Sequence, residues 1–566
     1  MKAETRAGLY LALAVLIALF SLHAALAFTS AGVPFLTPTG FATSVKVAAA
    51  RIGGGSLPDG VMLAAPVVYW VVFGLLVAIL CAAWWFIARW WSNRHPHRVK
   101  VEGTLGRQEV RTQNERSGKG PRPIGFIDGQ PFYPTFEDSF TVLAMSGAGK
   151  TMRFVVQMVV HAVGAVVTTS TRMDVFLLTA WQRSRRGRVL VFAPEYGILQ
   201  RWKWRVGWNI VAGCENPAVA QERADALVAA RPLGKGSSNS SFFAESASIV
   251  LRCLLHAAAI GNVQTQKPYT MRDVVSWMRD FDDDTPYTVL QRSTHPLVER
   301  QWLKDLKNYC RGEAKETRNN TAQTIGIMLK SLALPEILDA VCPAEGRLML
   351  DIDEFLASTD SLYLLSKKKG LAAPVITALA ESLQSKAMDA GEEAPLSPVL
   401  TMVLDELANV CPMPSAPSLM TDGRGHGIQV AAILQGRKQA IQRFGEEGAD
   451  TIIHLSSCLI IFGGSRDYQM LTELSGLTDE REVERSSTST GTNGTSTSTS
   501  TAKERVLTVG ELRTLAEGHA AMFYRNLPVG ILHMPAWWES DERDDYTRSQ
   551  QWATEQLRRQ DVATAA

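Results

Sequence analysis

Residues 141–151 read TVLAMSGAGKT and nearly match the pattern of a phosphate-binding loop, Gly-x-x-x-x-Gly-Lys-Ser/Thr. Ala144 stands where the first glycine belongs, while Gly149, Lys150 and Thr151 complete the pattern. Such loops bind phosphates mainly through consecutive backbone N–H groups and the lysine, so alanine at the first position is costly only in a left-handed backbone conformation. We therefore expect this loop to bind a nucleotide.

The residues around the loop favour this interpretation over a chance glycine-rich turn. An apolar run at 140–145 predicts a buried strand, and residues 152–163 predict a helix whose N-terminus faces the phosphates. The Lys150 ammonium would contact the phosphates, and the Thr151 hydroxyl would ligate Mg²⁺. The predicted nucleotide-binding residues are Ser146, Gly147, Ala148, Gly149, Lys150 and Thr151.

A second group of candidate residues ends a later apolar run, VLDE at 403–406. Asp405 would hold Mg²⁺, usually through water, and Glu406 would orient or deprotonate the attacking water. An apolar run that ends in two acids is a weak signal alone, because a carboxylate at the end of a strand also caps helices. Paired with the upstream loop, it predicts one site for ATP and Mg²⁺.

Two further residues could act on the transferred phosphoryl group. Arg424 lies among glycines in DGRGHG at 422–427, and an arginine on such a loop suits insertion into the site of a neighbouring subunit. A plain surface turn is an equal alternative. Gln435 ends the strand predicted at 428–435, where its amide could contact the γ-phosphate or the attacking water. The predicted catalytic residues are Glu406, Arg424 and Gln435.

Length and charge limit the possible functions. A chain of 566 residues suggests about three or four domains. The net charge of +2 gives no bulk attraction for nucleic acid, so any such contact is local or arises on assembly. Basic clusters at 201–205 (RWKWR) and 367–369 (KKK) could bind a phosphate backbone, although a hairpin surface and a solvated face are the plainer interpretations. The seven cysteines form no Cys-x-x-Cys pair, which favours a reducing compartment.

Two segments, 8–28 and 61–87, are long and apolar enough to cross a membrane. A hydrocarbon core of about 30 Å requires roughly 20 helical residues. Basic residues flank the pair on the side that the positive-inside rule assigns to the cytoplasm: Lys2, Arg6, Arg89, Arg94, Arg98 and Lys100. We expect a hairpin in the inner membrane, with residues 29–60 outside and the main body in the cytoplasm. A cleaved signal peptide is the alternative for the first segment, because ALA at 25–27 resembles a cleavage site.

The order of periodic segments predicts an α/β domain interrupted by helices. Strands alternate with helices before residue 216 and after residue 346, as in a mainly parallel sheet covered on both faces. The Ser/Thr-rich tract at 486–501 predicts a solvated, flexible loop. The expected parts are a membrane anchor (1–93), a linker (94–135), a nucleotide-binding domain in two pieces (136–216 and 346–538), an inserted all-α domain (217–345) and a flexible tail (539–566).

This order of motifs resembles the type IV coupling proteins, the membrane-anchored hexameric ATPases of conjugative DNA transfer. That family belongs to a wider group that includes the septal DNA translocases. The resemblance covers most of the chain. The stretches that carry it are AMSGAGKT (144–151), VVTTSTRMD (166–174), FFAESA (242–247), VLDELAN (403–409), GRGHGIQVAAILQ (423–435) and VLTVGEL (506–512).

The resemblance implies a RecA-like P-loop NTPase domain with an inserted all-helical domain. It also implies ATP hydrolysis with Mg²⁺ and the pumping of single-stranded DNA, with a bound relaxase-type protein, into a type IV secretion channel. By matching motif, Asp405 and Glu406 resemble the family's acidic pair, Arg424 its trans-acting finger and Gln435 its sensor. The chain departs from the family pattern at Ala144 and at WNI (208–210), where Asn-Pro-Leu is common.

Two other functions are compatible with these motifs. The first is a double-stranded DNA translocase of the septal type, which usually carries a C-terminal winged-helix domain for which the residues after 539 leave no room. The second is a membrane receptor that binds nucleotide only for assembly, an interpretation that Ala144 keeps open. A pure receptor gives no reason for Lys150, Asp405 and Glu406 to coexist.

Overall fold

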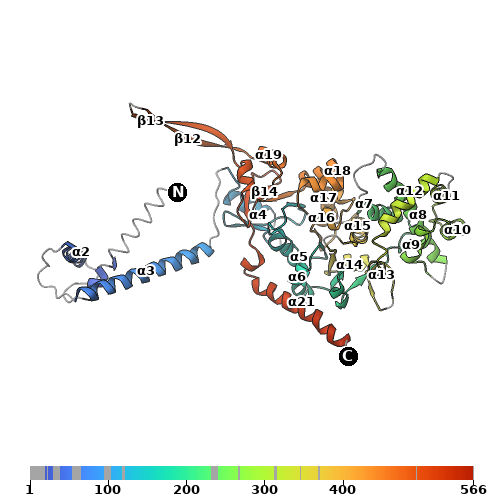
Figure 1. The fold of residues 1–566 in the computed structure, drawn as a ribbon, viewed down its shortest axis with the longest axis horizontal. Helices are drawn as coiled ribbons and strands as arrows, with labels where there is room; N and C mark the ends of the chain where they lie inside the picture. The colour runs from blue at the N-terminus through green and yellow to red at the C-terminus, as the bar shows by residue number, and fades with distance from the viewer. Residues whose placement is uncertain are drawn as a thin grey trace. The chain divides into compact units, whose positions relative to one another are not determined.

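A computed structural model of the chain describes residues 20–21, 23–27, 29, 38–53, 65–94, 103–117, 122–230, 240–264, 268–311, 315–344, 346–367, 370–491 and 494–564. The chain divides into two compact units, Met1–Arg98 and Val99–Ala566 (Figure 1). We refer to them as the anchor unit and the main unit.

The anchor unit contains helices α2 (Pro38–Gly53) and α3 (Pro66–Arg94). Leu26 and Val47 are buried against Phe73 of α3 and its neighbours. Most of the predicted membrane segment 8–28 lies outside the described residues. Helix α2 falls in the connection expected outside the membrane, where the sequence analysis predicted no element.

Membrane-spanning potential differs between the two units. By length and apolar composition, the described residues contain one helical stretch that could span a membrane, Ala244–Gln264, and 78% of its most apolar window is buried inside the main unit. That burial makes it a core helix. Helix α3 contains a shorter apolar stretch, Trp70–Trp84, and it leaves large apolar side chains exposed, including Leu75 at 58% and Ile79 at 61%.

The main unit is built on an eleven-stranded sheet. In order across the sheet, the strands are β2 (Gln130–Phe132), β1 (Gly125–Ile127), β15 (Gly530–His533), β14 (His519–Tyr524), β11 (Cys458–Phe462), β3 (Phe140–Leu143), β10 (Ile428–Leu434), β9 (Leu400–Leu404), β4 (Val166–Ser170), β8 (Ser361–Leu365) and β5 (Val189–Phe192). Strands β11 to β5 are parallel, and β14, β15, β1 and β2 extend the sheet in antiparallel pairs.

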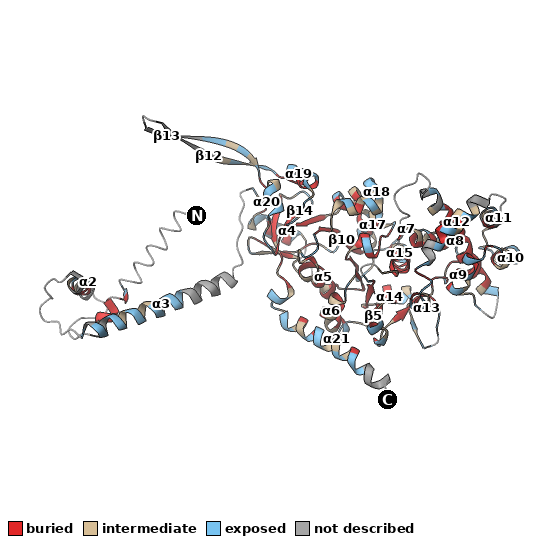
Figure 2. Ribbon diagram, in the orientation of Figure 1, coloured by how far each residue is buried: buried red, intermediate tan, exposed pale blue. Residues whose placement is uncertain are grey.

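The seven parallel strands are buried along their whole length, as Figure 2 shows. Parallel sheets need helices on both faces, which explains why these strands read as continuous apolar runs in the sequence. The register pairs Leu434 of β10 with Leu143 of β3, so these strands end at one edge of the sheet. We call this the C-terminal edge, and the opposite one the N-terminal edge.

Helices and short helical turns connect and cover these strands. They are η1 (Thr151–Val155), α5 (Val156–His161), α6 (Asp174–Ser184), η2 (Gly197–Arg201), α14 (Ile352–Leu356), α15 (Ala373–Ala390), α16 (Leu407–Val410), α17 (Ala416–Asp422), η3 (Gly423–His426), α18 (Arg437–His454), α19 (Tyr468–Gly476) and α20 (Val509–Arg513).

Between the two pieces of the sheet domain, the described residues form a helical lobe around the buried helix α8. Its helices are α7 (Pro217–Ala229), α8 (Ser240–Gln264), α9 (Met271–Arg279), α10 (Thr285–Arg292), α11 (Trp302–Arg311), α12 (Lys315–Leu329) and α13 (Pro335–Ala340). A short parallel pair, β6 (Val206–Gly207) and β7 (Leu348–Met349), joins the two ends of this insertion. The chain therefore enters and leaves the helical lobe at neighbouring positions.

The prediction of a linker at 94–135 is wrong for its second half. Helix α4 (Arg107–Arg116) and strands β1 and β2 belong to the main unit, and β1 pairs with β15. Asn114 donates a hydrogen bond to the Pro131 carbonyl at 2.7 Å, which ties the helix to the hairpin. Three-residue strands give too short a pattern to recognise, and β15, which pairs with β1, lies some 400 residues later.

The predicted flexible loop at 486–501 is also wrong. It forms a long antiparallel ribbon of β12 (Glu480–Gly491) and β13 (Gly494–Arg505), which extends away from the sheet of the main unit in Figure 1. The register places Thr488 opposite Thr497. Threonine is β-branched and favours extended backbone, so alternation of serine with threonine supports strands even in a low-complexity tract.

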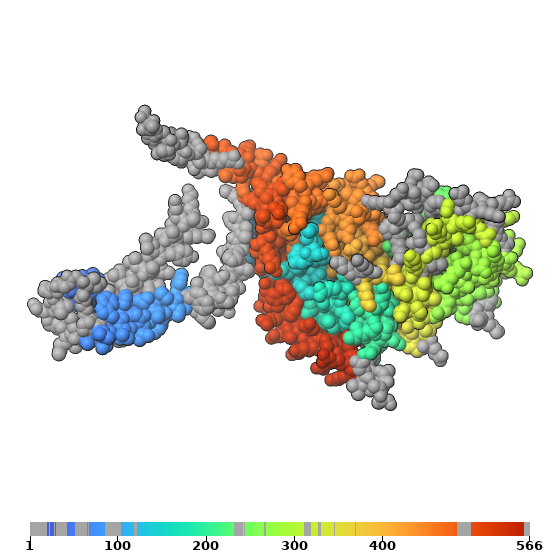
Figure 3. All heavy atoms as spheres, viewed as in Figure 1, coloured from blue at the N-terminus to red at the C-terminus, as the bar shows by residue number. Residues whose placement is uncertain are grey.

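The predicted flexible tail after residue 539 is a helix, α21 (Arg543–Thr564), which follows the turn η4 (Trp537–Glu539). It packs along α6 (Figure 3), where the Ser549 hydroxyl donates to the Leu177 carbonyl at 2.9 Å. Tyr546, Ser549 and Leu557 are buried. Their spacing places them on one face of the helix, a signal that the many charged residues around them obscured.

Arg183 is the main polar link beneath the parallel strands. Its side chain is fully buried on α6 and donates to the Ser361 hydroxyl at 2.6 Å and to the Gly164 and Thr359 carbonyls at 3.0 and 2.8 Å. Burial lowers the pKa of its guanidinium to about 10, so the group stays charged at neutral pH. It thereby donates hydrogen bonds to backbone carbonyl groups in the loops that precede β4 and β8.

Replacement of Arg183 by methionine should lower the free energy of unfolding by about 3–5 kcal/mol, because buried carbonyl groups lose their donors. Thermal or urea unfolding of the full chain measures the loss. Arg185→Met is the matched control, since Arg185 is an exposed arginine on the same helix end, and it should change stability by less than about 0.5 kcal/mol. Equal stability of the two variants would contradict the assigned role.

Candidate nucleotide site

The phosphate-loop sequence connects the end of β3 with the π-helical turn η1. Gly147 and Gly149 have φ values of +87° and +84°, which only glycine adopts readily. Ala144 is buried, its N–H donates to the Leu434 carbonyl at 3.0 Å, and it is not among the non-glycine residues of the described chain with positive φ. Its methyl group therefore causes no strain, and the departure from glycine is compatible with the loop.

The structure brings the loop and the first predicted acid together. The Lys150 ammonium donates to Asp405 Oδ1 at 2.8 Å, and the Thr151 hydroxyl donates to Asp405 Oδ2 at 3.3 Å. Lys150 and Asp405 are both buried. Thr169 on the neighbouring strand β4 donates its hydroxyl to the Asp405 carbonyl at 2.8 Å. The sequence did not indicate Thr169, because the pairing of β4 with β9 is decided only in the fold.

The residues at this edge fit a magnesium nucleotide. Thr151 and Asp405 supply hydroxyl and carboxylate oxygens, the ligand types that Mg²⁺ prefers. Lys150 supplies a positive charge for phosphates beside the left-handed glycines. Ser146 and Gly147 are exposed, and Ala148 and Gly149 are half-buried, so their backbone is open to a ligand.

Glu406 follows Asp405 in a strained backbone conformation. Its φ and ψ are 54° and 41°, a left-handed geometry that costs a residue with a side chain of the order of 1 kcal/mol or more. The buried Leu407 and Ala408 that follow hold this turn in place. The half-buried carboxylate accepts one long hydrogen bond, 3.4 Å from the Asn409 amide. Such strain commonly marks functional positions.

Gln435 and Arg424 lie at opposite ends of β10. Gln435 directly follows Leu434, which pairs with the last residue of β3, so Gln435 is at the C-terminal edge beside the phosphate loop. Arg424 precedes the strand in η3 and lies at the N-terminal edge, exposed and without an ion pair among the described residues. Seven residues of strand separate the two edges by roughly 20 Å. Arg424 therefore cannot reach the phosphate loop of its own chain.

One aromatic residue of the first basic cluster has a structural role in this fold, and the backbone of Lys367 in the second contacts a neighbouring acid. Trp202 is buried, donates its indole N–H to the Val189 carbonyl at 2.7 Å and packs on Phe176. It is a core residue and cannot stack on a base. Lys367 lies in a loop at the C-terminal edge, where the Glu195 carboxylate accepts from its backbone N–H at 3.2 Å. Residues 368 and 369 lie outside the described part of the chain.

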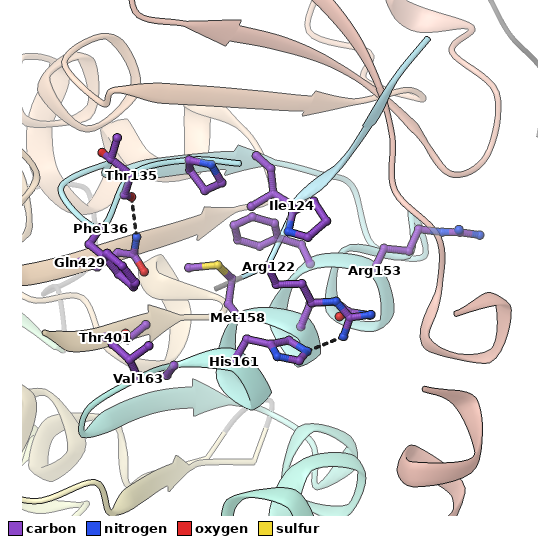
Figure 4. A pocket seen from close by; sticks show the side chains of 15 residues that line it. Arg122, Ile124, Thr135, Phe136, Arg153, Met158, His161, Val163, Thr401 and Gln429 are labelled. Atoms are coloured by element: carbon purple, nitrogen blue, oxygen red, sulfur yellow. Dashed lines mark hydrogen bonds between the residues drawn. The ribbon is translucent and has the colours of Figure 1, made fainter. Parts of the chain in front are cut away.

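A separate cleft opens toward the N-terminal edge, where Thr401 and Gln429 lie near the starts of β9 and β10 (Figure 4). Its walls are mainly apolar, and at one end Arg122 contacts His161 and Glu542 of the C-terminal segment. Burial lowers the pKa of His161, although the hydrogen bond to Glu542 opposes the shift. The cleft contains none of the predicted nucleotide-binding residues.

Glu381 supports the helix that leads to Arg424. It is buried on α15, and its carboxylate accepts a hydrogen bond from the Ser415 N–H at 2.9 Å, directly before α17. Burial raises the pKa of the Glu381 carboxyl to about 7, and the nearby acids Glu222 and Asp225 add to the rise, although Ser415 opposes it. The position of α17 thus depends on a group that titrates near neutral pH.

Comparison with known proteins identifies relatives of parts of this chain. Residues 399–517 match the family described as "TraM recognition site of TraD and TraG". No curated protein matches the sequence. The fold is similar to the bacterial conjugative coupling protein TrwB in a trigonal form with sulphate, with a TM-score of 0.54 and 19% identity over 75% of this chain and 92% of that one.

Two other solved structures are less similar. TrwB in complex with a non-hydrolysable ATP analogue has a TM-score of 0.49 and 18% identity over 76% of this chain and 92% of that one. VirB4 of Thermoanaerobacter pseudethanolicus has a TM-score of 0.44 and 12% identity over 74% and 97%. The family match and the trigonal TrwB structure confirm the resemblance to coupling proteins, and the latter confirms a RecA-like fold for the main unit. The N-terminal membrane hairpin stays a prediction.

Replacement of Glu381 by glutamine should change how stability depends on pH. Because the folded pKa is raised above the unfolded value of 4.5, Glu381 contributes stability below about pH 4.5 that is lost as pH rises through about 7. The loss amounts to about 3 kcal/mol. The melting temperature of Glu381→Gln should therefore rise relative to that of the unmodified chain between pH 5 and pH 8. A constant difference across this range would contradict the raised pKa.

Proposed function

We propose that this chain is a membrane-anchored ATPase that couples ATP hydrolysis to the delivery of single-stranded DNA, with bound protein, into a type IV secretion channel. The observation that carries the proposal is the cluster of Lys150, Thr151 and Asp405 at the C-terminal edge of a RecA-like sheet. A phosphate loop that contacts an acid on a neighbouring buried strand is the arrangement that Mg-nucleotide hydrolysis needs.

Each residue at this edge has a distinct chemical role in the proposal. Lys150 and the loop backbone bind the phosphates, and Asp405 and Thr151 hold Mg²⁺, which would neutralise charge on the phosphoryl group. Glu406 accepts a proton from the attacking water or orients it, since within the described part of the chain its carboxylate accepts only the long hydrogen bond from Asn409. Gln435 binds the γ-phosphate or that water from the end of the adjacent strand.

The position of Arg424 supports assembly into a ring. An exposed arginine at the N-terminal edge can neutralise charge only in the site of another subunit. If one subunit's N-terminal edge packs on the C-terminal edge of the next, the interface is heterologous, and it forms a ring when the rotation from one subunit to the next closes. We infer a hexamer by analogy with the coupling proteins. ATP hydrolysis at successive subunit interfaces would then move a strand of DNA through the centre of the ring.

Helix α3 supports membrane attachment. Its apolar side chains are exposed along the stretch Trp70–Trp84, and water is an unfavourable environment for such a surface. We propose that α3 spans the inner membrane, that the segment at 8–28 spans it as well, and that the main unit lies in the cytoplasm. The aromatic residues Trp84, Trp85, Trp90 and Trp91 would lie at the cytoplasmic interface.

The region 399–517 supports a protein partner. The family that it matches is described by recognition of TraM. In this chain the region runs from the start of β9 to the segment before β14, so the acidic pair and Arg424 lie inside it. We propose that the protein component of a DNA–relaxase complex binds here, close to residues that act on the nucleotide.

The first test is ATP turnover by the full chain in detergent, with and without single-stranded DNA. Single-stranded DNA should stimulate hydrolysis. Lys150→Ala should lose nucleotide binding, and Glu406→Gln should keep binding while turnover falls about 100-fold or more. Glu555→Gln, an exposed acid on α21, is the control and should leave turnover unchanged. Nucleotide binding without turnover in assembled wild-type rings would favour the receptor function, and stimulation by duplex DNA alone would favour the double-stranded translocase.

The second test mixes two inactive variants. Arg424→Ala and Lys150→Ala rings should each lose turnover by about 1,000-fold or more. Random mixing in equal amounts pairs an intact phosphate loop with an intact Arg424 at about a quarter of the interfaces, and should restore up to that share of activity. If Arg424 acted on its own chain, the mixture would stay inactive.

A further inference from the structure

The order of strands determines which way a nucleotide lies across the phosphate loop. On one side of β3 are β10 and β9, whose ends carry Gln435 and Asp405–Glu406. The γ-phosphate must lie on that side, because the metal ligand and the attacking water are there. The base is at the other end of the molecule, so it lies on the opposite side of β3, toward β11 and β14. This step rests on the proposed function.

The segments on that side come from the C-terminal part of the chain. Strand β14 is antiparallel to β11, so it begins at the C-terminal edge, and β15 ends there because His519 pairs with His533. Residues 517–519 and 533–539 are therefore neighbours of the phosphate loop. Sequence analysis predicted no function for either segment.

Arg153 connects the loop to these segments. Its side chain lies directly against Gly149, since a Cβ at that glycine would be 3.0 Å from Arg153 Nε. The buried guanidinium donates to the Met534 carbonyl at 2.9 Å and pairs with Glu539 at 2.8 Å and Glu517 at 3.2 Å. Figure 4 shows this side chain pointing away from the cleft, toward the C-terminal segment. The buried Arg153 guanidinium contacts both the phosphate loop and the C-terminal segment, and these contacts fix the distance between them.

Trp538 stands beyond Arg153 and is accessible to a ligand. Its ring is centred 6.0 Å from the Arg153 guanidinium, and the residue is 44% exposed. Its neighbour Trp537 packs edge-on against it at 5.5 Å and contacts the buried Tyr546 of α21. Helix α21 thus packs against the turn through Trp537, while the side chain of Trp538 remains accessible to solvent next to Arg153.

We propose that Trp538 is the platform on which the planar base of the nucleoside triphosphate stacks, and that Arg153 is the positioning residue that holds it at the correct distance from the loop. The base has a π-face, and an exposed indole beside a phosphate site is the side chain that recognises it best.

The test measures how much the base and the phosphates each contribute to binding affinity. The full chain in detergent is titrated calorimetrically with the β,γ-imido analogue of ATP and, separately, with inorganic tripolyphosphate, both with Mg²⁺. Trp538→Ala should raise the Kd for the analogue roughly 5- to 100-fold, the range that stacking of one base on an aromatic side chain provides. The Kd for tripolyphosphate should change less than about twofold.

Two further variants complete the design. Trp538→Phe keeps an aromatic face and should retain most of the affinity for the analogue. Phe136→Ala removes a partly exposed aromatic residue at the N-terminal edge, 38% exposed, and should leave both Kd values unchanged. These results together would assign the stacking to Trp538 rather than to loss of aromatic surface in general.

Four results would overturn the inference. An unchanged Kd for the analogue in Trp538→Ala excludes stacking, and an equal loss of affinity for tripolyphosphate means that Trp538 supports the loop instead of the base. If the unmodified chain binds tripolyphosphate as tightly as the analogue, it has no base subsite, while the proposed phosphate site stands. Failure of the unmodified chain to bind either ligand would reject the proposed function as well.

Discussion

The parallel alignment of β3, β10 and β9 is the constraint on which the candidate site depends. Parallel strands end at the same edge, so a loop after β3 and an acid after β9 meet although about 250 residues separate them in sequence. Because Lys150 and Asp405 are both buried, each charge needs the other: either one alone in that place would strongly destabilise the fold. The same alignment places Arg424 at the N-terminal edge, where it cannot reach the phosphate loop of its own chain.

Buried arginines hold together segments that are distant in sequence. Arg183 satisfies backbone carbonyl groups of two loops beneath the sheet, and Arg153 ties the helix of the phosphate loop to the last strands of the chain. A guanidinium suits this task because it has five donors in a rigid plane and stays charged when buried. The segment that leads into α21 is thereby tied to the helix of the phosphate loop.

Sequence patterns predicted the central strands and the loop because each has a strong local signal: long apolar runs, the glycines at 147 and 149, and Lys150. They failed for α4, β1 and β2, which are short, and for α21, whose buried face of Tyr546, Ser549 and Leu557 is hidden among charged residues. They failed at 486–501 because low complexity suggested a flexible loop, whereas alternating β-branched residues favour strands. Local patterns carry no information about partners far along the chain.

By itself, the sequence determined which residues are candidates for the chemistry: a lysine and a threonine for phosphate and metal, two acids in succession, and an arginine on a glycine-rich turn, all identified from residue types and their spacing. Only the tertiary structure decided which of these residues share a site. It joined Lys150 to Asp405, separated Arg424 from both, and placed Trp538 next to Arg153, whose side chain lies against the loop. The physical reason is that strand order and direction depend on packing across the whole sheet, which no short stretch of sequence encodes.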